Sequence, residues 1–265
     1  MTDAPREQRL VFGEVAETYD RVRPGYPQAL VDDVLAFARL GAGDGVLEVG
    51  CGTGKVTVQF ASRGLELLCI EPSTTMAAVA RRNCERFPSV TILTASFEDW
   101  PVVRRGFRLL ISAQAWHWVS PEVRLPKAYD ALAPAGVLAV FWNTVEWRDE
   151  EMRVAIDNLY GRLAPELVAR RPGFPGTRPS RHLSVQELED SSLFDSFTAR
   201  QYQWSETYAT DGYLELLTTH SDHRMLPPDV FGRLADALAR LIDDSGGVLR
   251  VDYVTRLYLA RRSAD

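Results

Sequence analysis

A glycine-rich turn and a carboxylate that follows it are the residues of this sequence best suited to hold a small ligand. Gly50, Gly52 and Gly54 alternate with other residues directly after a short apolar run, Gly45–Val49. Glycine lets the backbone turn sharply there and lets a ligand approach main-chain atoms that a Cβ would block. Glu71 stands about twenty residues further on, where a carboxylate accepts hydrogen bonds from ribose hydroxyl groups. The spacing therefore predicts a nucleoside site.

Two common nucleotide motifs are excluded by the residues around the turn. A dinucleotide fingerprint, G-x-G-x-x-G, requires glycine or alanine where this chain has Lys55. A P-loop requires glycine at position 49 and serine or threonine after its lysine, but the chain has Val49 and Val56. The turn therefore favours a nucleoside without a pyrophosphate or triphosphate. The alternatives are a tight strand-to-helix connection without a ligand and, for Glu71, an exposed acid before Pro72.

His117 is the residue whose chemistry best suits proton transfer. It stands between Trp116 and Trp118, shortly after the apolar run 107–113. An imidazole titrates near neutral pH and can accept a proton from a reacting group. We therefore expect His117 as the catalytic candidate; the alternative is a structural histidine bonded to the backbone while the tryptophans pack.

The spacing of the other histidines does not predict a metal site. His220 and His223 lie three residues apart on an expected helix, which provides at most half of a ligand set. No third ligand is evident, because Asp222 is expected to face elsewhere at helical spacing.

The elements that must position these residues alternate between apolar runs and helical patterns. The runs expected as buried strands are Gly45–Val49, Leu65–Ile70, Val90–Ala95, Phe107–Ala113 and Gly136–Trp142. The expected helices are Gln28–Leu40, Thr53–Arg63, one that Ser73 caps and that runs to about Arg86, and Pro121–Leu132. This alternation implies βαβ units, a parallel sheet and right-handed crossovers.

The pattern changes after Trp142. Glu146–Arg170 is expected to form one or two charged helices, and Arg170–Arg181 is too rich in proline and glycine for regular structure. The latter segment is expected to be a solvated insertion or, alternatively, a lid that recognises an acidic substrate. Phe197–Trp204 and Leu249–Ala260 are expected to pair as strands at one edge of the sheet. Helices are expected between them at about Asp211–Thr219 and Asp229–Asp243.

The composition is that of an ordinary globular protein, with 46% hydrophobic and 25% charged residues in a chain of 265. No apolar run is long enough for a membrane span and no signal-peptide core is present at the start, so we expect a cytoplasmic protein without membrane partners. The net charge of −6 argues against nucleic acid as the main partner. An odd number of cysteines is typical of reduced thiols; they are Cys51, Cys69 and Cys84.

The glycine turn, Glu71 and His117 belong to segments whose content and order are informative. These segments are Glu48–Gly54, Cys69–Met76, Ala95–Asp99 and Ser112–Trp118. Together they resemble the motifs of the class I S-adenosylmethionine-dependent methyltransferases, and the resemblance extends from about Phe12 to Asn143. It implies an α/β fold with a Rossmann-like, doubly wound, mostly parallel seven-stranded sheet, an antiparallel last strand and helical cap insertions. It also implies S-adenosyl-L-methionine as the cofactor.

The same resemblance assigns cofactor-binding roles within these segments. Glu71 would hold the ribose hydroxyls, Met76 would pack near the adenine, and Ser96 would lie beside the adenine edge. Many relatives carry aspartate in place of Ser96 and alanine in place of Phe97, which leaves adenine hydrogen bonding by Ser96 open. The residues implied by these segments are Glu48, Gly50, Cys51, Gly52, Gly54, Glu71, Pro72, Met76, Ser96, Phe97, Ala113 and Gln114.

The N-terminal segment Phe12–Pro27 narrows the resemblance further. It is similar to small-molecule methyltransferases of the trans-aconitate methyltransferase type, in which this segment closes over the cofactor. On this resemblance Tyr19 and Arg23 contact the cofactor's carboxylate, because the planar guanidinium offers a pair of donors. The alternative is that both residues only pack the N-terminal arm.

The expected reaction is methyl transfer from S-adenosylmethionine to an N, O, S or C nucleophile of a small metabolite, such as a carboxylic acid or a natural-product intermediate. The alternatives are a protein or nucleic-acid methyltransferase and a non-catalytic S-adenosylmethionine-binding accessory protein. Against DNA modification, Ser112–Ala115 lacks the Asp/Asn-Pro-Pro-aromatic signature, and no cysteine follows that strand.

The chain is expected to form a single domain and to act as a monomer or homodimer. Its expected parts are an N-terminal arm (1–40), a cofactor-binding core (41–142), cap insertions (143–192 and 205–247) and closing strands (193–204 and 248–261).

Overall fold

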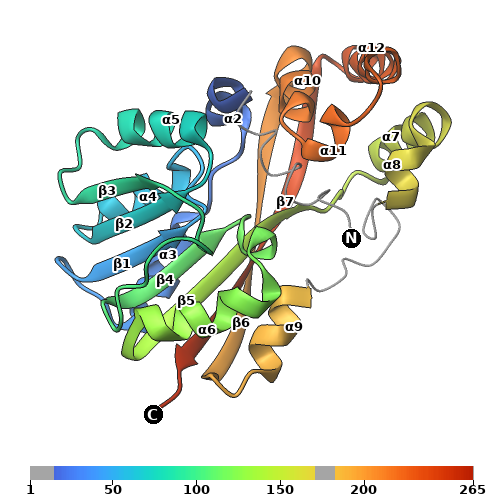
Figure 1. Cartoon of the computed structure of the whole chain (residues 1–265). Coiled ribbons are helices and arrows are strands. Elements are labelled where there is room, and N and C mark those ends of the chain that lie inside the picture. Colours follow the sequence, from blue (N-terminus) through green and yellow to red (C-terminus); the bar gives the residue numbers. More distant parts are fainter. Residues whose placement is uncertain (1–14, 171–182, 265) are drawn as a thin grey trace.

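A seven-stranded sheet forms the centre of the computed structural model, which describes residues 15–170 and 183–264 (Figure 1). The strands are β1 (Gly45–Val49), β2 (Glu66–Glu71), β3 (Val90–Thr94), β4 (Phe107–Ala113), β5 (Leu132–Val145), β6 (Phe194–Ala209) and β7 (Val248–Arg262). Their order in the sheet is β3-β2-β1-β4-β5-β7-β6. The pairs from β3 to β5 are parallel, whereas β7 runs antiparallel to both β5 and β6. This confirms the predicted fold class and the late strand pair.

The strand order reverses between β1 and β4. From β1 the chain builds outward to β2 and β3, and it then crosses back to add β4 and β5 on the other side. Open α/β sheets bind ligands at such a reversal, outside the carboxyl ends of the strands. The glycine turn follows β1 at this point, and Gln114 follows β4.

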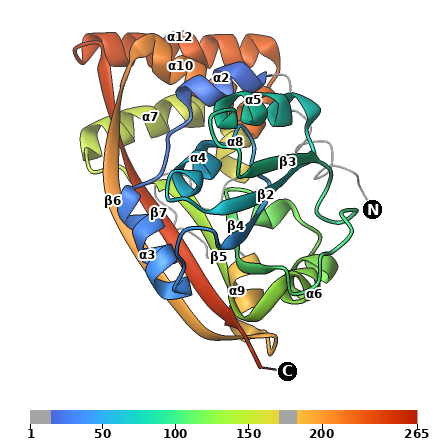
Figure 2. The same cartoon turned by 90° about the vertical axis from the view of Figure 1, so that its left-hand side faces the viewer.

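Helices cover both faces of the sheet (Figures 1 and 2). One face carries α3 (Gln28–Ala38), α4 (Lys55–Ala61) and α5 (Thr74–Cys84). The other carries η2 (Trp116–Trp118), α6 (Pro121–Ala131) and α9 (Leu183–Asp190). Neighbouring residues of β1 point to opposite faces, so Val46 packs in the first core and Leu47 in the second. Both faces of the strand are therefore buried, as its short, mainly apolar sequence predicted.

A separate helical cap covers the C-terminal end of β6 and the N-terminal end of β7. Its helices are α7 (Glu150–Leu163), α8 (Pro165–Arg170), α10 (Thr210–Thr218), α11 (Ser221–Arg224) and α12 (Pro228–Asp244). Tyr160, Leu216, Leu238 and Val251 belong to a core of their own there. Residues 171–182, which hold most of the predicted arginine-rich segment, lie outside the described residues.

The last three strands are longer than the sequence predicted. β5 has 14 residues, and β6 extends to Ala209, beyond the predicted end at residue 204. β6 pairs with β7 up to the partners Ala209 and Val248. After Trp204 every residue of β6 except Tyr208 is exposed, so the sequence shows no apolar alternation beyond the predicted end of the strand. Its length depends on pairing with β7 and packing on the cap.

Among the described residues, no helix combines the length and apolar character needed to cross a membrane.

Candidate active site

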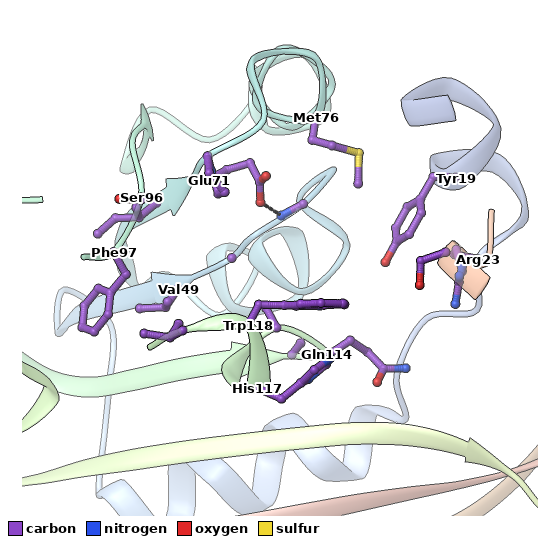
Figure 3. A pocket seen from close by; sticks show the side chains of 18 of the residues that line it. Tyr19, Arg23, Val49, Glu71, Met76, Ser96, Phe97, Gln114, His117 and Trp118 are labelled. Atoms are coloured by element: carbon purple, nitrogen blue, oxygen red, sulfur yellow. Dashed lines mark hydrogen bonds between the residues drawn. The ribbon is translucent and has the colours of Figure 1, made fainter. Parts of the chain in front are cut away.

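A cavity of about 680 Å³ opens where the strand order reverses, bordered by α2 (Ala16–Val22) and α11 (Figure 3). It brings together residues from six separate parts of the chain. The residues predicted from the sequence that line it are Tyr19, Arg23, Gly50, Gly52, Glu71, Pro72, Met76, Ser96, Phe97, Ala113, Gln114 and His117. Glu48, Cys51 and Gly54 are not among its lining residues.

The glycine turn brings the loops after β1 and β4 into contact. Gly50 has a φ of 72°, in the left-handed region that glycine adopts without strain. A Cβ at Gly50 would lie 2.4 Å from the Cβ of Ala115, far inside van der Waals contact. Gln114, the residue before Ala115, also has a positive φ, of 57°. Such a conformation in a non-glycine residue is uncommon and occurs more often at functional sites.

The carboxylate of Glu71 is held in place by two backbone amides. The amide of Gly52 donates to Oε2 at 2.9 Å (Figure 3). The amide of Ser73 donates to Oε1, also at 2.9 Å. Ser73 also caps α5, because its hydroxyl accepts from the amide of Met76 at 3.3 Å. Glu71 is buried yet borders the cavity, so a positioned acceptor faces the space beside the turn. This arrangement fits a ligand with vicinal hydroxyl groups.

Glu48 lies beneath the turn rather than in the cavity. Its Oε2 accepts from the hydroxyl of Thr57 at 2.7 Å and from the Cys69 thiol at 3.6 Å. Burial away from water raises the pKa of Glu48 to about 7, although the bond from Thr57 partly offsets this effect. Glu48 therefore supports the turn from the α4 side.

Gly54 and Cys51 belong to the turn but lie outside the main cavity. A Cβ at Gly54 would lie 3.4 Å from Ala80 and from Cys84, so the absence of a side chain lets α4 pack closely on α5. Cys51 borders a small neighbouring cavity and is buried. Cys51, Cys69 and Cys84 are free thiols, as their odd number predicted.

The loop after β3 supplies one wall of the cavity. The hydroxyl of Ser96 donates to Asp99 at 2.6 Å and accepts from the amide of that residue at 3.1 Å. Phe97 is 3% exposed, stacks on Trp100 and contacts Trp116. Ser96 thus stabilises the loop, and Phe97 fills the core beneath it while its edge reaches the cavity.

A hydrogen bond from a buried tryptophan orients His117. The indole nitrogen of Trp142 donates to Nδ1 of His117 at 3.1 Å. An indole N–H is only a donor, so Nδ1 is unprotonated and a neutral His117 carries its proton on Nε2. In this tautomer His117 presents a donor rather than a base. Trp118, which also lines the cavity, packs 4.8 Å from the imidazole, measured between ring centroids.

Helix α2 is fastened to both the core and the cap. Glu17 pairs with Arg82 of α5 at 2.7 Å, and Arg21 pairs with Glu215 of α10 at 2.9 Å. Arg23 donates to the hydroxyl and the carbonyl of Thr219 at 2.8 and 2.7 Å. The guanidinium also lies over the ring of Tyr19 (Figure 3). Arg23 thus borders the cavity while tethering the N-terminal arm to the cap.

Helix α11 forms part of the cavity wall, which the sequence did not predict. His220, Ser221, Asp222 and Met225 line the cavity, although no motif marks them. The expectation that Asp222 faces away from His223 is wrong: its Oδ1 lies 2.9 Å from Nδ1 of His223 and accepts from the amide of that residue at 2.8 Å. A helix of four residues does not impose helical side-chain directions, so Asp222 folds back on its neighbour.

Comparison with known proteins relates both the core and the whole chain to one enzyme family. A family profile described as a methyltransferase domain matches residues 46–136. A protein of Mycobacterium tuberculosis (strain H37Rv), named an uncharacterized methyltransferase, is 35% identical over 243 residues, which cover 91% of this chain and 89% of that protein. The chain belongs to the class I S-adenosylmethionine-dependent methyltransferases.

Solved structures share the fold of this methyltransferase. A protein of Anaeromyxobacter dehalogenans named as a type II methyltransferase superposes with a TM-score of 0.61 at 23% identity and covers 90% of this chain and 97% of its own. Phosphoethanolamine N-methyltransferase 2 of Haemonchus contortus, solved with phosphomonomethylethanolamine and S-adenosylhomocysteine, superposes with a TM-score of 0.57 at 15% identity, covering 95% of this chain and 58% of its own. The matched profile ends at residue 136, before the α11 side of the methyltransferase cavity.

Proposed function

We propose that this methyltransferase transfers the methyl group of S-adenosylmethionine to a small molecule that binds in the same cavity, beside His117, Trp118 and α11. The observation that carries the proposal is that one cavity of about 680 Å³ borders both Glu71 and His220. This volume is typical of sites for small ligands. Helices α2 and α11 border the cavity, which favours a small acceptor over a polymer.

The cofactor half of the cavity would be the side formed by the glycine turn. Gly50 and Gly52 leave backbone there that a ligand can approach, and Glu71 would accept hydrogen bonds from the ribose hydroxyls. Met76 would pack near the adenine, with Ser96 and Phe97 beside it. When bound, S-adenosylmethionine supplies an activated methyl group for displacement by the acceptor's nucleophile.

The acceptor half would be the side formed by His117, Trp118 and α11. Nε2 of His117 would donate a hydrogen bond to an oxygen or nitrogen of the acceptor, because Trp142 occupies Nδ1. The rings of Trp118 and His117 would exclude water and orient the nucleophile. The chain's main contribution would be positioning.

The class of acceptor rests on the N-terminal segment. Its resemblance to methyltransferases of the trans-aconitate type supports a small carboxylic acid, with natural-product intermediates as the second class. Arg23, the residue directly after α2, is a cation that borders the cavity, and two of its nitrogens bind Thr219.

Calorimetry with S-adenosylmethionine, followed by assays of S-adenosylhomocysteine release with a metabolite panel, tests the proposal. We expect micromolar cofactor binding and turnover with at least one small carboxylic acid or natural-product intermediate. No cofactor binding would overturn the proposal. Release only with protein or nucleic acid would favour a macromolecular methyltransferase, and binding without turnover on any substrate would favour an accessory protein.

A further inference from the structure

Three potential metal ligands lie close together on and beside α11, at the side of the cavity that this helix borders. His220, Asp222 and His223 each offer one ligand atom, and these atoms all lie within 4.8 Å of one another. His220 and Asp222 line the cavity, whereas His223 is buried behind them. We propose that these residues form a binding site for a divalent transition-metal ion.

The donor set decides which class of ion fits. Two imidazoles and one carboxylate suit first-row transition ions such as Zn²⁺, Co²⁺ or Mn²⁺ better than Mg²⁺ or Ca²⁺, which prefer oxygen ligands. Ligands bonded at about 2.1 Å to one ion lie about 3.0–3.4 Å apart. The Asp222 and His223 atoms already lie 2.9 Å apart. His220 precedes α11 in extended backbone and is half-buried, so its side chain would rotate on metal binding to close the remaining separation.

A buried tyrosine prepares His223 for this role. The hydroxyl of Tyr160 lies 2.7 Å from Nε2 of His223, which directs Nδ1 towards Asp222. Metal-binding histidines generally use their second nitrogen in such a bond, which sets the ring orientation and the tautomer. On metal binding the proton of His223 would sit on Nε2 and be donated to the Tyr160 oxygen, while Nδ1 binds the ion. Asp222 keeps the backbone amide of His223 as a donor.

The position of the cluster gives the ion a role in the cavity. Three protein ligands leave coordination positions open, as in catalytic metal sites. His220 and Asp222 border the same cavity as His117 and Trp118, so an open position faces the space assigned to the acceptor. The ion would therefore bind an oxygen or nitrogen atom of the acceptor. Metal binding can be measured without cofactor or acceptor, so its failure is distinguishable from failure of the proposed methyl transfer.

Titration of the untagged, metal-free full-length protein with Zn²⁺ and Co²⁺ tests the site. We expect one ion per chain by calorimetry and a visible Co²⁺ absorption band. His220→Ala and Asp222→Asn should each weaken binding at least tenfold. Tyr160→Phe should weaken it by about 10- to 100-fold, because it removes the partner that orients His223.

Matched variants separate the cluster from other histidines and carboxylates. His117 lies in the same cavity but outside the cluster, and Asp229 lies at the exposed start of α12. The variants His117→Ala and Asp229→Asn should therefore both retain wild-type metal affinity. His220 and Asp222 are not fully buried, so their variants should fold, which circular dichroism checks. The proposal is overturned if neither ion binds at millimolar concentration, or if folded His220→Ala and Asp222→Asn bind as the wild type does.

Discussion

Trp142 donates its indole N–H to Nδ1 of His117 across 3.1 Å, from a position in β5 that is 3% exposed. Because this donor cannot act as an acceptor, the bond selects the tautomer with the proton on Nε2. At a pH at which the imidazole of His117 is neutral, we expect ¹⁵N-edited NMR to show His117 as the Nε2–H tautomer. In Trp142→Phe the preference should weaken. Detection of the Nδ1–H form in the wild-type protein would contradict this assignment and restore a base at Nε2.

Replacing Glu71 tests the cofactor half of the cavity. Glu71→Ala should weaken S-adenosylmethionine binding by about 10- to 100-fold, since hydrogen bonds to a charged acceptor contribute roughly 1.5–3 kcal/mol. Calorimetry gives the affinity directly. Glu66→Gln, at the exposed start of the same strand, is the matched control and should bind like the wild type. An unchanged affinity in Glu71→Ala would refute the ribose role.

Gly50→Ala tests the contact between the two loops. The new methyl group would meet Ala115 and the positive φ would be strained, so we expect destabilisation by about 2–4 kcal/mol. Urea unfolding measures it. Adding Ala115→Gly should restore part of the loss by removing the clash but not the strain. Gly161→Ala, where nothing lies within 4 Å, should leave stability unchanged or slightly raised. Equal stability of Gly50→Ala and the wild type would be inconsistent with the loop contact.

The buried carboxyl of Glu48 should make stability depend on pH. Its pKa rises from 4.5 to about 7 on folding, so the folded chain keeps this proton more tightly than the unfolded chain. The contribution of Glu48 is therefore most favourable below pH 4.5 and is lost as the pH rises to 7, by about 2–3 kcal/mol.

Glu48→Gln should remove this part of the pH dependence. Urea unfolding of both proteins at pH 5 and pH 7.5 measures the difference, and Glu66→Gln again serves as the control. Between pH 5 and pH 7.5 the free energy of unfolding should fall less in Glu48→Gln than in the wild type. Parallel pH profiles for the wild type and Glu48→Gln would show that the carboxyl titrates normally.

Local features of the sequence determined the side of the cavity that the glycine turn forms. The turn at Gly50, the carboxylate at Glu71 and the cap at Ser73 follow from backbone conformation and short-range hydrogen bonds, which depend on neighbouring residues. Apolar runs such as Gly45–Val49 predicted the buried parallel strands for the same reason. These features sufficed for the fold class and the family.

Tertiary structure alone decided the other side of the cavity. His117 reaches its tautomer through Trp142, which is 25 residues away, and His223 meets Tyr160 across 63 residues. Helix α11 borders the cavity only because the cap packs on the long β6–β7 pair and Arg23 ties α2 to Thr219. Contacts between distant segments leave no periodic pattern in the chain. Local physics therefore specified the glycine turn and the Glu71 carboxylate, while long-range packing specified the residues on the opposite side of the cavity.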